Sequence, residues 1–266
     1  MTNTHVADGV HFSRALVRLP GAAFAAGLTE AGLGAPDLAL ARAQHAAYCA
    51  ALERCGLVLT ALPAADDFPD ATFVEDTAVV RADTAILTRP GATARAGEVA
   101  RVAPVLHQAF AQVRTIEAPG TVDGGDVCQL GNHFLIGLSG RTNAEGARQL
   151  SALLAEQGCS ADTIDIHGLP GILHLKSALT YLGEDRIAVM AALAAHPALA
   201  RFRHLPVAAE ETYAANCLRV NDRVLIAAGF PRFADDLAAL GIDAIALDMS
   251  EFRKMDGALT CLSLRF

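Results

Sequence analysis

Hydrophobic and polar positions alternate along this chain in a unit that recurs several times. The unit reads as a strand that opens on polar residues, a tight turn, a second strand, an amphipathic helix and a short third strand. Hairpins are predicted at residues 73–88, 126–138, 176–190 and 217–228, with Gly, Asn or Asp in their turns. Thr142 and Glu145 form a predicted capping box at the start of one helix. The pattern therefore predicts an α/β fold built from ββαβ units.

The two ends of the chain supply a fifth hairpin. Residues 12–19 and residues 259–266 each form a predicted strand that would stay an unpaired edge unless the two strands meet. Their pairing closes a ring, which predicts a five-bladed α/β propeller of pseudo-fivefold ββαβ units around a central channel. We expect residues 1–266 to form this single domain. Polar residues open the hairpins at nearly regular intervals and should converge on the axis: Asp76, Asp126, Lys176, Asn216 and Cys261.

Composition narrows the class of protein. Hydrophobic residues make up 53% of the 266 residues and charged residues 19%, which is ample material for a packed core. The formal charge of −8 argues against nucleic acid as a partner, because phosphate binding requires a basic surface. It suits a small cationic substrate. The six cysteines occur singly, so we expect neither a zinc cassette nor a disulfide framework, and no metal.

The sequence also bears on where the protein works. Residues 1–8 lack the basic segment and the following apolar segment of a secretory signal. The apolar-rich stretch at residues 187–200 is shorter than the roughly 20 residues that cross a membrane, and it contains His196 and Pro197. We therefore expect a soluble cytoplasmic protein without a membrane partner. A homodimer is compatible with these features.

Three acidic residues near the first hairpin are candidates for binding a cation. Asp70, Glu75 and Asp76 surround an apolar triplet at the entry to a predicted buried strand, in FPDATFVED at residues 68–76. A buried carboxylate needs a positive partner or hydrogen-bond donors, and a guanidinium group would serve. Taken alone, the motif favours a structural interpretation, in which Asp70 is a turn residue and the two following acids pair with internal arginines.

A histidine and a cysteine elsewhere in the chain are candidates for covalent catalysis. His174 opens an apolar strand, and a catalytic histidine needs a carboxylate to fix its tautomer and a nucleophile to serve. Asp123 or Asp126 could supply the carboxylate, because the two glycines between them allow a close approach. Cys261, on the terminal strand, could supply the thiol. Two rival thiols lie near other hairpin openings: Cys128 and Cys217.

In this order along the chain, the motifs resemble those of the dimethylarginine dimethylaminohydrolase family, a branch of the guanidino-modifying enzymes with a five-bladed α/β propeller. The resemblance spans nearly the whole chain. The matching segments are FPDATFVED (68–76), TRPGA (88–92), GTVDGGD (120–126), RTNAEGAR (141–148), HLKS (174–177), YAANC (213–217) and DGALTCLSLRF (256–266). Their number and order make the resemblance specific.

The resemblance implies a cofactor-free cysteine hydrolase that converts Nω-methylated L-arginine to L-citrulline and dimethylamine or methylamine. Cys261 would be the nucleophile, His174 the general acid and base, and Asp123 the third catalytic residue, where bacterial members can carry glutamate. Arg95 and Arg141 would grip the substrate carboxylate. The other residues implied in substrate binding are Leu28 of a mobile lid, the acids Asp70, Glu75 and Asp76, and Asp256.

Three alternatives stay open. Arginine deiminases share the cysteine chemistry but carry aspartate two residues after the histidine, where this chain has Lys176. Amidinotransferases pass the amidino group to an amine instead of water. A non-catalytic propeller, such as a translation initiation factor, would bind a ribosomal surface and needs no acid, histidine and cysteine on its axis. The presence of all three residue types on separate blades favours an enzyme.

Overall fold

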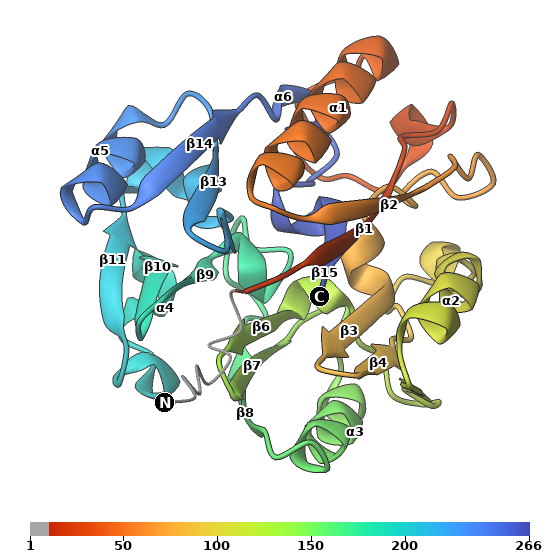
Figure 1. The fold of residues 1–266 in the computed structure, drawn as a ribbon. Coiled ribbons are helices and arrows are strands. Elements are labelled where there is room, and N and C mark those ends of the chain that lie inside the picture. Colours follow the sequence, from red (N-terminus) through yellow and green to blue (C-terminus); the bar gives the residue numbers. More distant parts are fainter. Residues whose placement is uncertain (1–10) are drawn as a thin grey trace, which may run out of the picture.

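A computed structural model of the protein describes residues 11–266, so the prediction made for residues 1–8 lies outside the described residues. Figure 1 looks down a ring of five three-stranded sheets, with both described ends of the chain in the same blade. The α/β propeller predicted from the repeat is therefore confirmed. The blade that closes the ring contains β15 (Ser263–Arg265), β1 (Arg14–Arg18) and β2 (Val58–Leu62). The other four blades follow in chain order: β3 (Ala78–Arg81), β4 (Thr84–Leu87) and β5 (Gln112–Thr115); β6 (Val127–Leu130), β7 (His133–Leu138) and β8 (Ser160–Asp165); β9 (Leu179–Gly183), β10 (Arg186–Met190) and β11 (Arg203–Val207); β12 (Leu218–Val220), β13 (Arg223–Ala227) and β14 (Asp243–Leu247).

Every blade has the same pairing. Its first strand is antiparallel to its middle strand, and its last strand is parallel to the middle strand. In the closing blade the first strand comes from the far end of the chain, and β15 pairs with β1 with Leu264 opposite Leu16. The predicted pairing of the two chain ends is thus confirmed, and it leaves neither strand as a lone edge.

Helices cover the outer side of the ring (Figure 1). They are α1 (Leu38–Arg54), α2 (Glu98–Ala109), α3 (Ala144–Ala155), α4 (Ala191–Ala194), α5 (Pro231–Ala239) and α6 (Ser250–Arg253). Four of them bury a pair of apolar residues four positions apart, which places both on one helical face. These pairs are Tyr48 and Leu52, Val102 and Leu106, Leu150 and Leu154, and Phe233 and Leu237.

The helix α3 begins differently from the prediction. Its N-cap is Asn143, whose side chain accepts the backbone N–H of Gly146 at 2.8 Å. Thr142 lies one residue earlier, and its hydroxyl accepts the backbone N–H of Asp123 instead. Glu145 pairs with Arg148. The predicted capping box is therefore wrong, because the Thr142 hydroxyl serves a neighbouring loop rather than its own helix.

Short 3₁₀ turns connect many of the strands and helices, and five of those in the described residues directly precede the first strand of a blade. They are η1 (Phe24–Ala26), η2 (Val74–Thr77), η3 (Thr93–Arg95), η4 (Gly124–Asp126), η5 (Leu175–Ser177), η6 (Pro197–Leu199), η7 (Ala209–Ala215) and η8 (Thr260–Leu262). The five polar residues predicted to open inner strands lie in or directly after η2, η4, η5, η7 and η8. Each inner strand therefore starts two residues or so later than the sequence pattern indicates.

These turns tie neighbouring blades together through a recurring hydrogen bond. Asp76 Oδ1 accepts the N–H of Gly125 at 2.7 Å, and Asp126 Oδ1 accepts the N–H of Leu175 at 3.0 Å. Asn216 Oδ1 likewise accepts the N–H of Thr260 at 3.1 Å. At the two remaining equivalent positions the chain has Lys176, which has no acceptor, and Cys261, which is a weak one. The side chains of Lys176 and Cys261 therefore do not form this hydrogen bond between blades.

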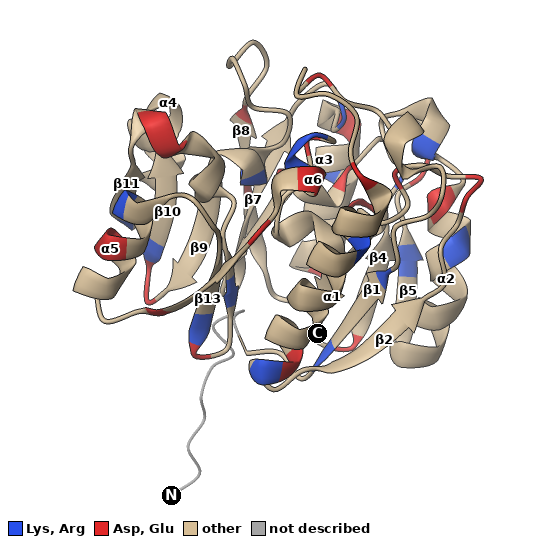
Figure 2. Ribbon diagram, turned by 90° about the horizontal axis from the view of Figure 1, so that it is seen from above, with Lys and Arg blue, Asp and Glu red and all other residues tan. Residues whose placement is uncertain are grey.

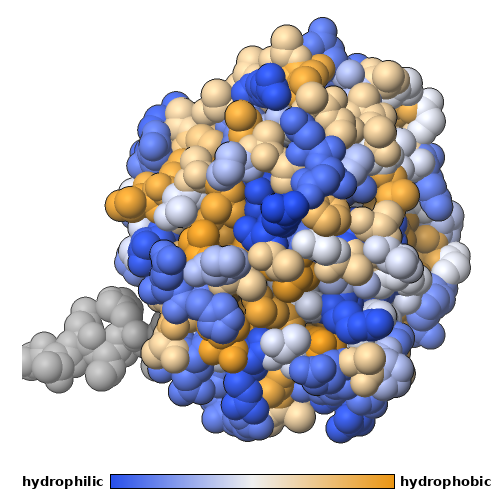
Figure 3. Space-filling view, turned by 90° about the vertical axis from the view of Figure 1, so that its right-hand side faces the viewer, coloured by the Kyte–Doolittle hydropathy of each residue, from blue (hydrophilic) through white to orange (hydrophobic). Residues whose placement is uncertain are grey.

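The outer surface is mixed in charge and polarity. Acidic and basic residues occur side by side on the same blades (Figure 2). On the face shown in Figure 3, apolar side chains form small groups separated by hydrophilic ones. Among the described residues 11–266, no helix is long and apolar enough to span a membrane.

Candidate active site

His174 and Asp123 form a buried pair at the inner end of two neighbouring blades. His174 Nε2 donates to Asp123 Oδ2 at 3.1 Å, and Asp123 Oδ1 accepts the N–H of Gly91 at 2.9 Å. Asp123 is fully buried and His174 is 7% exposed. Because the carboxylate holds the Nε2 proton, the other ring nitrogen, Nδ1, is the one available for chemistry. Of the two carboxylates left open by the sequence, Asp123 is the one bonded to the imidazole.

Two glycines make this approach feasible. A Cβ atom at Gly125 would lie 2.6 Å from His174 Nδ1, so the imidazole rests directly on the backbone. A Cβ atom at Gly124 would lie 1.9 Å from the carbonyl oxygen of Glu75. Any side chain at either position would push η4 away from the histidine or from η2. The Gly-Gly pair in the motif is therefore a packing requirement of the site.

Cys261 lies in η8, which packs against η2. Burial, together with the negative charges of Glu75 and Asp76, raises the pKa of the Cys261 thiol to about 12. Burial alone would lower the pKa of His174, but Asp76, Asp126 and Asp123 outweigh it and raise this pKa to about 9. Without a substrate, the site near neutral pH therefore holds a thiol and an imidazolium.

The rival cysteines lie in less accessible places. Burial raises the pKa of Cys128 to about 11 and that of Cys217 to about 12, so acidity does not distinguish them from Cys261. Exposure does, because Cys217 is fully buried and Cys128 is 4% exposed, whereas Cys261 is only partly buried. Cys128 in addition faces a different cavity, which Lys176 and Arg265 also line.

Asp76 anchors a buried ion-pair network. Its Oδ2 atom pairs with Arg95 Nη1 at 2.5 Å, and Arg95 also pairs with Glu98 at 2.7 Å. Burial opposes ionisation of Asp76, yet Arg95 and His174 hold its pKa at about 2. The remaining Arg95 donors reach the carbonyl oxygens of Asp70 and Phe73. Arg95 is thus held by Asp76 and Glu98, whereas the resemblance implied that it grips the substrate carboxylate.

Asp70 and Asp256 anchor the loop of residues 27–37. Both Asp70 carboxylate oxygens accept the N–H of Leu28, at 3.2 and 3.1 Å. Asp256 Oδ2 accepts the N–H of Glu30 at 2.6 Å, and its backbone adopts a φ of 55°. The Leu28 side chain is 42% exposed. Asp256 also borders a cavity of about 280 Å³ whose walls include Leu33, Leu173 and Asn216.

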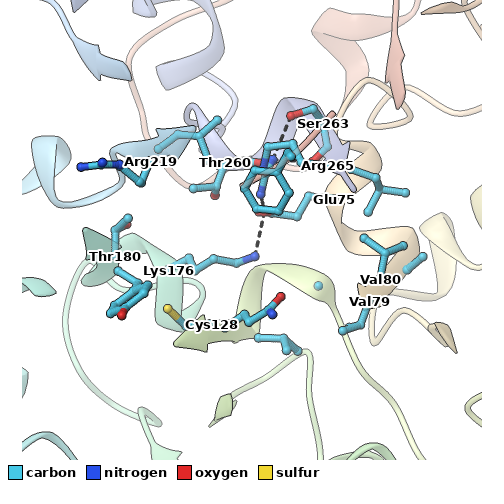
Figure 4. A pocket seen from close by; sticks show the side chains of 18 of the residues that line it. Glu75, Val79, Val80, Cys128, Lys176, Thr180, Arg219, Thr260, Ser263 and Arg265 are labelled. Carbon is cyan, nitrogen blue, oxygen red and sulfur yellow. Dashed lines mark hydrogen bonds and ion pairs between the residues drawn. The ribbon is translucent and has the colours of Figure 1, made fainter. Parts of the chain in front are cut away.

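Glu75 stands between the site and a second cavity on the axis. Its Oε1 atom pairs with Lys176 Nζ at 2.7 Å and with Arg265 Nη2 at 3.1 Å. Figure 4 shows Lys176 and Arg265 reaching Glu75 across this cavity of about 110 Å³, which Cys128 also lines. Lys176 therefore lies on the axis as predicted, and its side chain lines the cavity between the inner strands. Glu75 Oε2 is buried without a hydrogen-bond partner among the described residues.

Arg141 is the more accessible of the two arginines. Its side chain is 20% exposed, and Nη1 lies 3.8 Å from Asp123 Oδ2. Its backbone N–H donates to the hydroxyl of Ser139. Sequence reasoning missed Ser139 altogether, because a serine two residues before an arginine carries no distinctive signal.

One group of described residues has the spacing of a metal site. Ligand atoms of Asp76, Asp123 and His174 lie within 4.8 Å of one another. These atoms already bind one another, Arg95 and backbone N–H groups, as described above. The group is therefore a hydrogen-bonded acid–base pair beside a buried ion pair, and Glu75 and Cys261 lie in the adjoining turns η2 and η8.

Comparison with known proteins agrees with this geometry. Residues 64–220 match the arginine deiminase family model. The chain is 43% identical to an N(G),N(G)-dimethylarginine dimethylaminohydrolase of Pseudomonas aeruginosa, over 96% of this chain and 100% of the relative. It is 39% identical to the enzyme of the same name from Streptomyces coelicolor, over 95% and 96% of the two chains.

Solved structures give the same picture. A cysteine-to-serine mutant of the Pseudomonas aeruginosa enzyme in complex with citrulline superposes with a TM-score of 0.93 at 42% identity, covering 96% of this chain and 100% of the other. A histidine-to-glycine variant of a dimethylarginine dimethylaminohydrolase, in an adduct with S-methyl-L-thiocitrulline, gives a TM-score of 0.92 with the same coverage. The N-terminal domain of ArgZ, at 18% identity and a TM-score of 0.84, shares the fold.

Proposed function

Because the chain belongs to the dimethylarginine dimethylaminohydrolase family, we propose that Cys261, His174 and Asp123 catalyse its hydrolysis of Nω-methylated L-arginine. One observation carries the assignment of residues. The imidazole bonded to Asp123 lies among carboxylates that also act on the Cys261 thiol, as the shared influence of Asp76 on both pKa values indicates. Nucleophile, base and cation-binding acids thus occupy one small volume.

The carboxylates suit a guanidinium ion. Glu75 Oε2 has no partner among the described residues, and a buried carboxylate oxygen without a donor is costly. An N–H group of the substrate would satisfy it. The bound cation also brings a positive charge next to the Cys261 thiol and thereby lowers its pKa. Substrate binding therefore favours formation of the nucleophile that attacks it.

The reaction proceeds in two balanced halves. With the guanidinium bound, the Cys261 thiol loses its proton to solvent and the thiolate Sγ bonds to the central guanidinium carbon. His174 donates a proton to the methylated nitrogen, and the carbon–nitrogen bond breaks to release dimethylamine. A thiouronium on Cys261 remains. His174, now neutral, removes a proton from water, and the resulting hydroxide adds to the same carbon. The carbon–sulfur bond then breaks to give citrulline, and the remaining hydroxyl proton passes to the departing sulfur, which restores the Cys261 thiol and the imidazolium. Asp123 holds the imidazole in place throughout and stabilises its charged form.

The two pKa values predict an unusual pH dependence. The reactive pair is thiolate with imidazolium, yet in the free enzyme the pKa of Cys261 is about 12 and that of His174 is about 9. The reactive form is therefore a minor species whose fraction rises with pH up to the lower of these values. We expect kcat/KM for asymmetric dimethylarginine to rise roughly tenfold per pH unit between pH 6.5 and 8.5.

Initial-rate measurements across this pH range test the assignment. A kcat/KM that is constant from pH 6 to 8 and then falls would contradict it, because that profile belongs to a pre-formed thiolate beside a histidine of ordinary pKa. Retained secondary structure over the same range, measured by circular dichroism, excludes unfolding as the cause of the change.

Arg141 is proposed to bind the substrate carboxylate. Its guanidinium is partly exposed beside the site, whereas the donors of Arg95 are engaged with Asp76, Glu98 and backbone carbonyls. In Arg141→Met we expect KM to rise about 10- to 100-fold, with a smaller change in kcat. The matched control is Arg148→Met, which removes an exposed arginine of α3 that pairs with Glu145.

A truncated substrate isolates this contact. Nω,Nω-dimethylagmatine lacks the carboxylate but keeps the methylated guanidinium. Wild type and Arg141→Met should turn it over with similar kcat/KM, because the interaction that the mutation removes is already absent. A large loss of kcat/KM in Arg141→Met on this substrate would instead indicate that Arg141 positions Asp123, which lies 3.8 Å from its Nη1 atom.

Product analysis tests the proposed function as a whole. With chelator present, the enzyme should release citrulline and dimethylamine in equal amounts from asymmetric dimethylarginine. Turnover of unmethylated arginine with a higher kcat/KM would make it an arginine deiminase. The Lys176–Glu75 ion pair argues against that alternative, since a lysine with its own acidic partner replaces the aspartate that deiminases carry.

Three coarser features remain predictions. The closed ring of blades supports one catalytic domain over residues 1–266, and limited proteolysis should leave a single resistant core. A homodimer would give a molar mass of twice 27.7 kDa by light scattering. Cytoplasmic location is tested by fractionating cells that express the chain.

A further inference from the structure

Asp126 is a buried carboxylate that the reaction described above does not use. It is fully buried between the blades that carry Asp123 and His174. Its Oδ1 atom accepts the N–H of Leu175, the residue next to His174, at 3.0 Å. Its Oδ2 atom accepts the hydroxyl of Ser139 at 2.6 Å. Both oxygens are thus occupied by donors from two different blade segments.

Further hydrogen bonds connect Ser139 to Asp123. Its Oγ atom accepts the backbone N–H groups of Arg141 at 3.0 Å and Thr142 at 3.2 Å. The Thr142 hydroxyl accepts the N–H of Asp123 at 3.1 Å. Since Asp123 Oδ2 binds His174, the contacts form a closed circuit that starts and ends at Asp126. The circuit fixes the backbone of the acid and that of the histidine relative to each other.

The space around Asp126 is shaped for it. A Cβ atom at Gly137 would lie 2.9 Å from Asp126 Oδ1 and 2.9 Å from Leu175 Cβ. A glycine inside a strand, such as Gly137 near the end of β7, otherwise weakens it, because glycine contributes no side chain to packing. Its presence here leaves room for the carboxylate to reach η5.

We propose that Asp126 is a positioning residue for the proton transfers of His174, which it sets by fixing the backbone at Leu175 and the Ser139–Thr142 turn and by its charge. The inference rests on the proposed function. Other charged groups that face His174 are Asp76, paired with Arg95, and Asp123, beside Arg141. Asp126 differs from them in touching neither the imidazole nor an arginine, so its effect is exerted through the backbone and the field.

The variant Asp126→Asn tests both effects of Asp126, the one through its hydrogen bonds and the one through its charge. Asparagine keeps the size and the acceptor for Leu175, removes the charge, and directs an NH₂ group at Ser139, whose oxygen already accepts two N–H groups. We expect kcat to fall about 10- to 100-fold, with KM changed by less than about threefold. Loss of one negative charge should also lower the titration midpoint of His174 by about one pH unit.

Ser139→Ala tests the geometric part alone and serves if Asp126→Asn does not fold. It keeps the Asp126 charge but removes the hydroxyl that donates to Asp126 and accepts the backbone N–H groups of Arg141 and Thr142. We expect a lower kcat and an unchanged His174 midpoint. The matched control is Glu211→Gln, which neutralises another buried carboxylate that accepts the N–H groups of Arg232 and Phe233 at α5 and should leave kcat and midpoint at wild-type values.

The decisive experiment is NMR titration of the ligand-free protein with labelled histidine, combined with steady-state kinetics. The chain has nine histidines, and the His174 signal is identified by its loss in His174→Gln. An unmoved midpoint in folded Asp126→Asn, or full activity in Ser139→Ala, would overturn the proposal. The titration needs no substrate, so wild type that fails to turn over dimethylarginine refutes the proposed function and leaves this test intact.

Discussion

Cys261→Ser is expected to reduce citrulline release from asymmetric dimethylarginine by at least about 10³-fold, because the variant has no competent nucleophile. A serine hydroxyl is far less acidic than a thiol, so the bound guanidinium and the His174 imidazolium cannot ionise it near neutral pH. The exchange is nearly isosteric in a position that is only partly buried, so thermal stability should stay close to wild type.

The control for this variant is Cys128→Ser. Cys128 lies in β6 and lines the cavity on the far side of Glu75, and its sulfur has no role in the proposed steps. Its variant should retain activity within about threefold. If Cys128→Ser were inactive and Cys261→Ser active, the nucleophile would have to be reassigned.

His174→Gln is expected to block both halves of the reaction and to lower kcat about 10²- to 10⁴-fold on dimethylarginine. Dimethylamine is a poor leaving group unless it is protonated, and water is a poor nucleophile unless a base removes its proton. Glutamine can fill the site and hydrogen-bond with Asp123, but it can neither donate nor accept a proton at this stage. The loss should persist at every pH between 6 and 9.

A substrate with a better leaving group should separate the two halves. S-methyl-L-thiocitrulline releases methanethiolate, which departs without a general acid. In His174→Gln the Cys261 sulfur should therefore still bond to the substrate carbon, while the resulting thiouronium is not hydrolysed. A related histidine-to-glycine enzyme forms an adduct with this compound. Rapid turnover of S-methyl-L-thiocitrulline by His174→Gln, without a stable adduct, would show that another residue activates the water.

The blades of this fold could be read from the sequence because their signals are local. Alternating apolar residues between turn residues such as Asn221 and Asp222 determine each hairpin, and β12 and β13 meet at these two residues. The pairing of the chain ends required one further step, the rule that an apolar edge strand seeks a partner, and β1 with β15 confirms it.

The short turns at the axis could not be predicted in the same way. Asp76, Asp126 and Asn216 were interpreted as the openings of strands that face a polar cavity, but each binds a backbone N–H of the next blade. Such contacts depend on how two distant segments pack, and a periodic pattern contains no information about that. A polar residue on the axis can therefore serve to connect two blades as well as to bind substrate.

Residue spacing alone did not decide the pairing inside the site, although the family resemblance implied Asp123. Asp123 and Asp126 are three residues apart and equally plausible partners for His174, and only the bend at Gly124 and Gly125 decides between them. The Glu98 partner of Arg95 was missed, although a spacing of three residues near a helix start is a usable signal.

Mass spectrometry of the rapidly quenched enzyme tests the central claim most directly. Wild type mixed with asymmetric dimethylarginine in chelator and quenched in acid should carry, on the peptide that contains Cys261, the mass of the substrate minus dimethylamine. The adduct should form and decay at rates that account for citrulline release. Turnover with no adduct on any cysteine, or an adduct on Cys128 or Cys217 instead, would contradict covalent catalysis by Cys261.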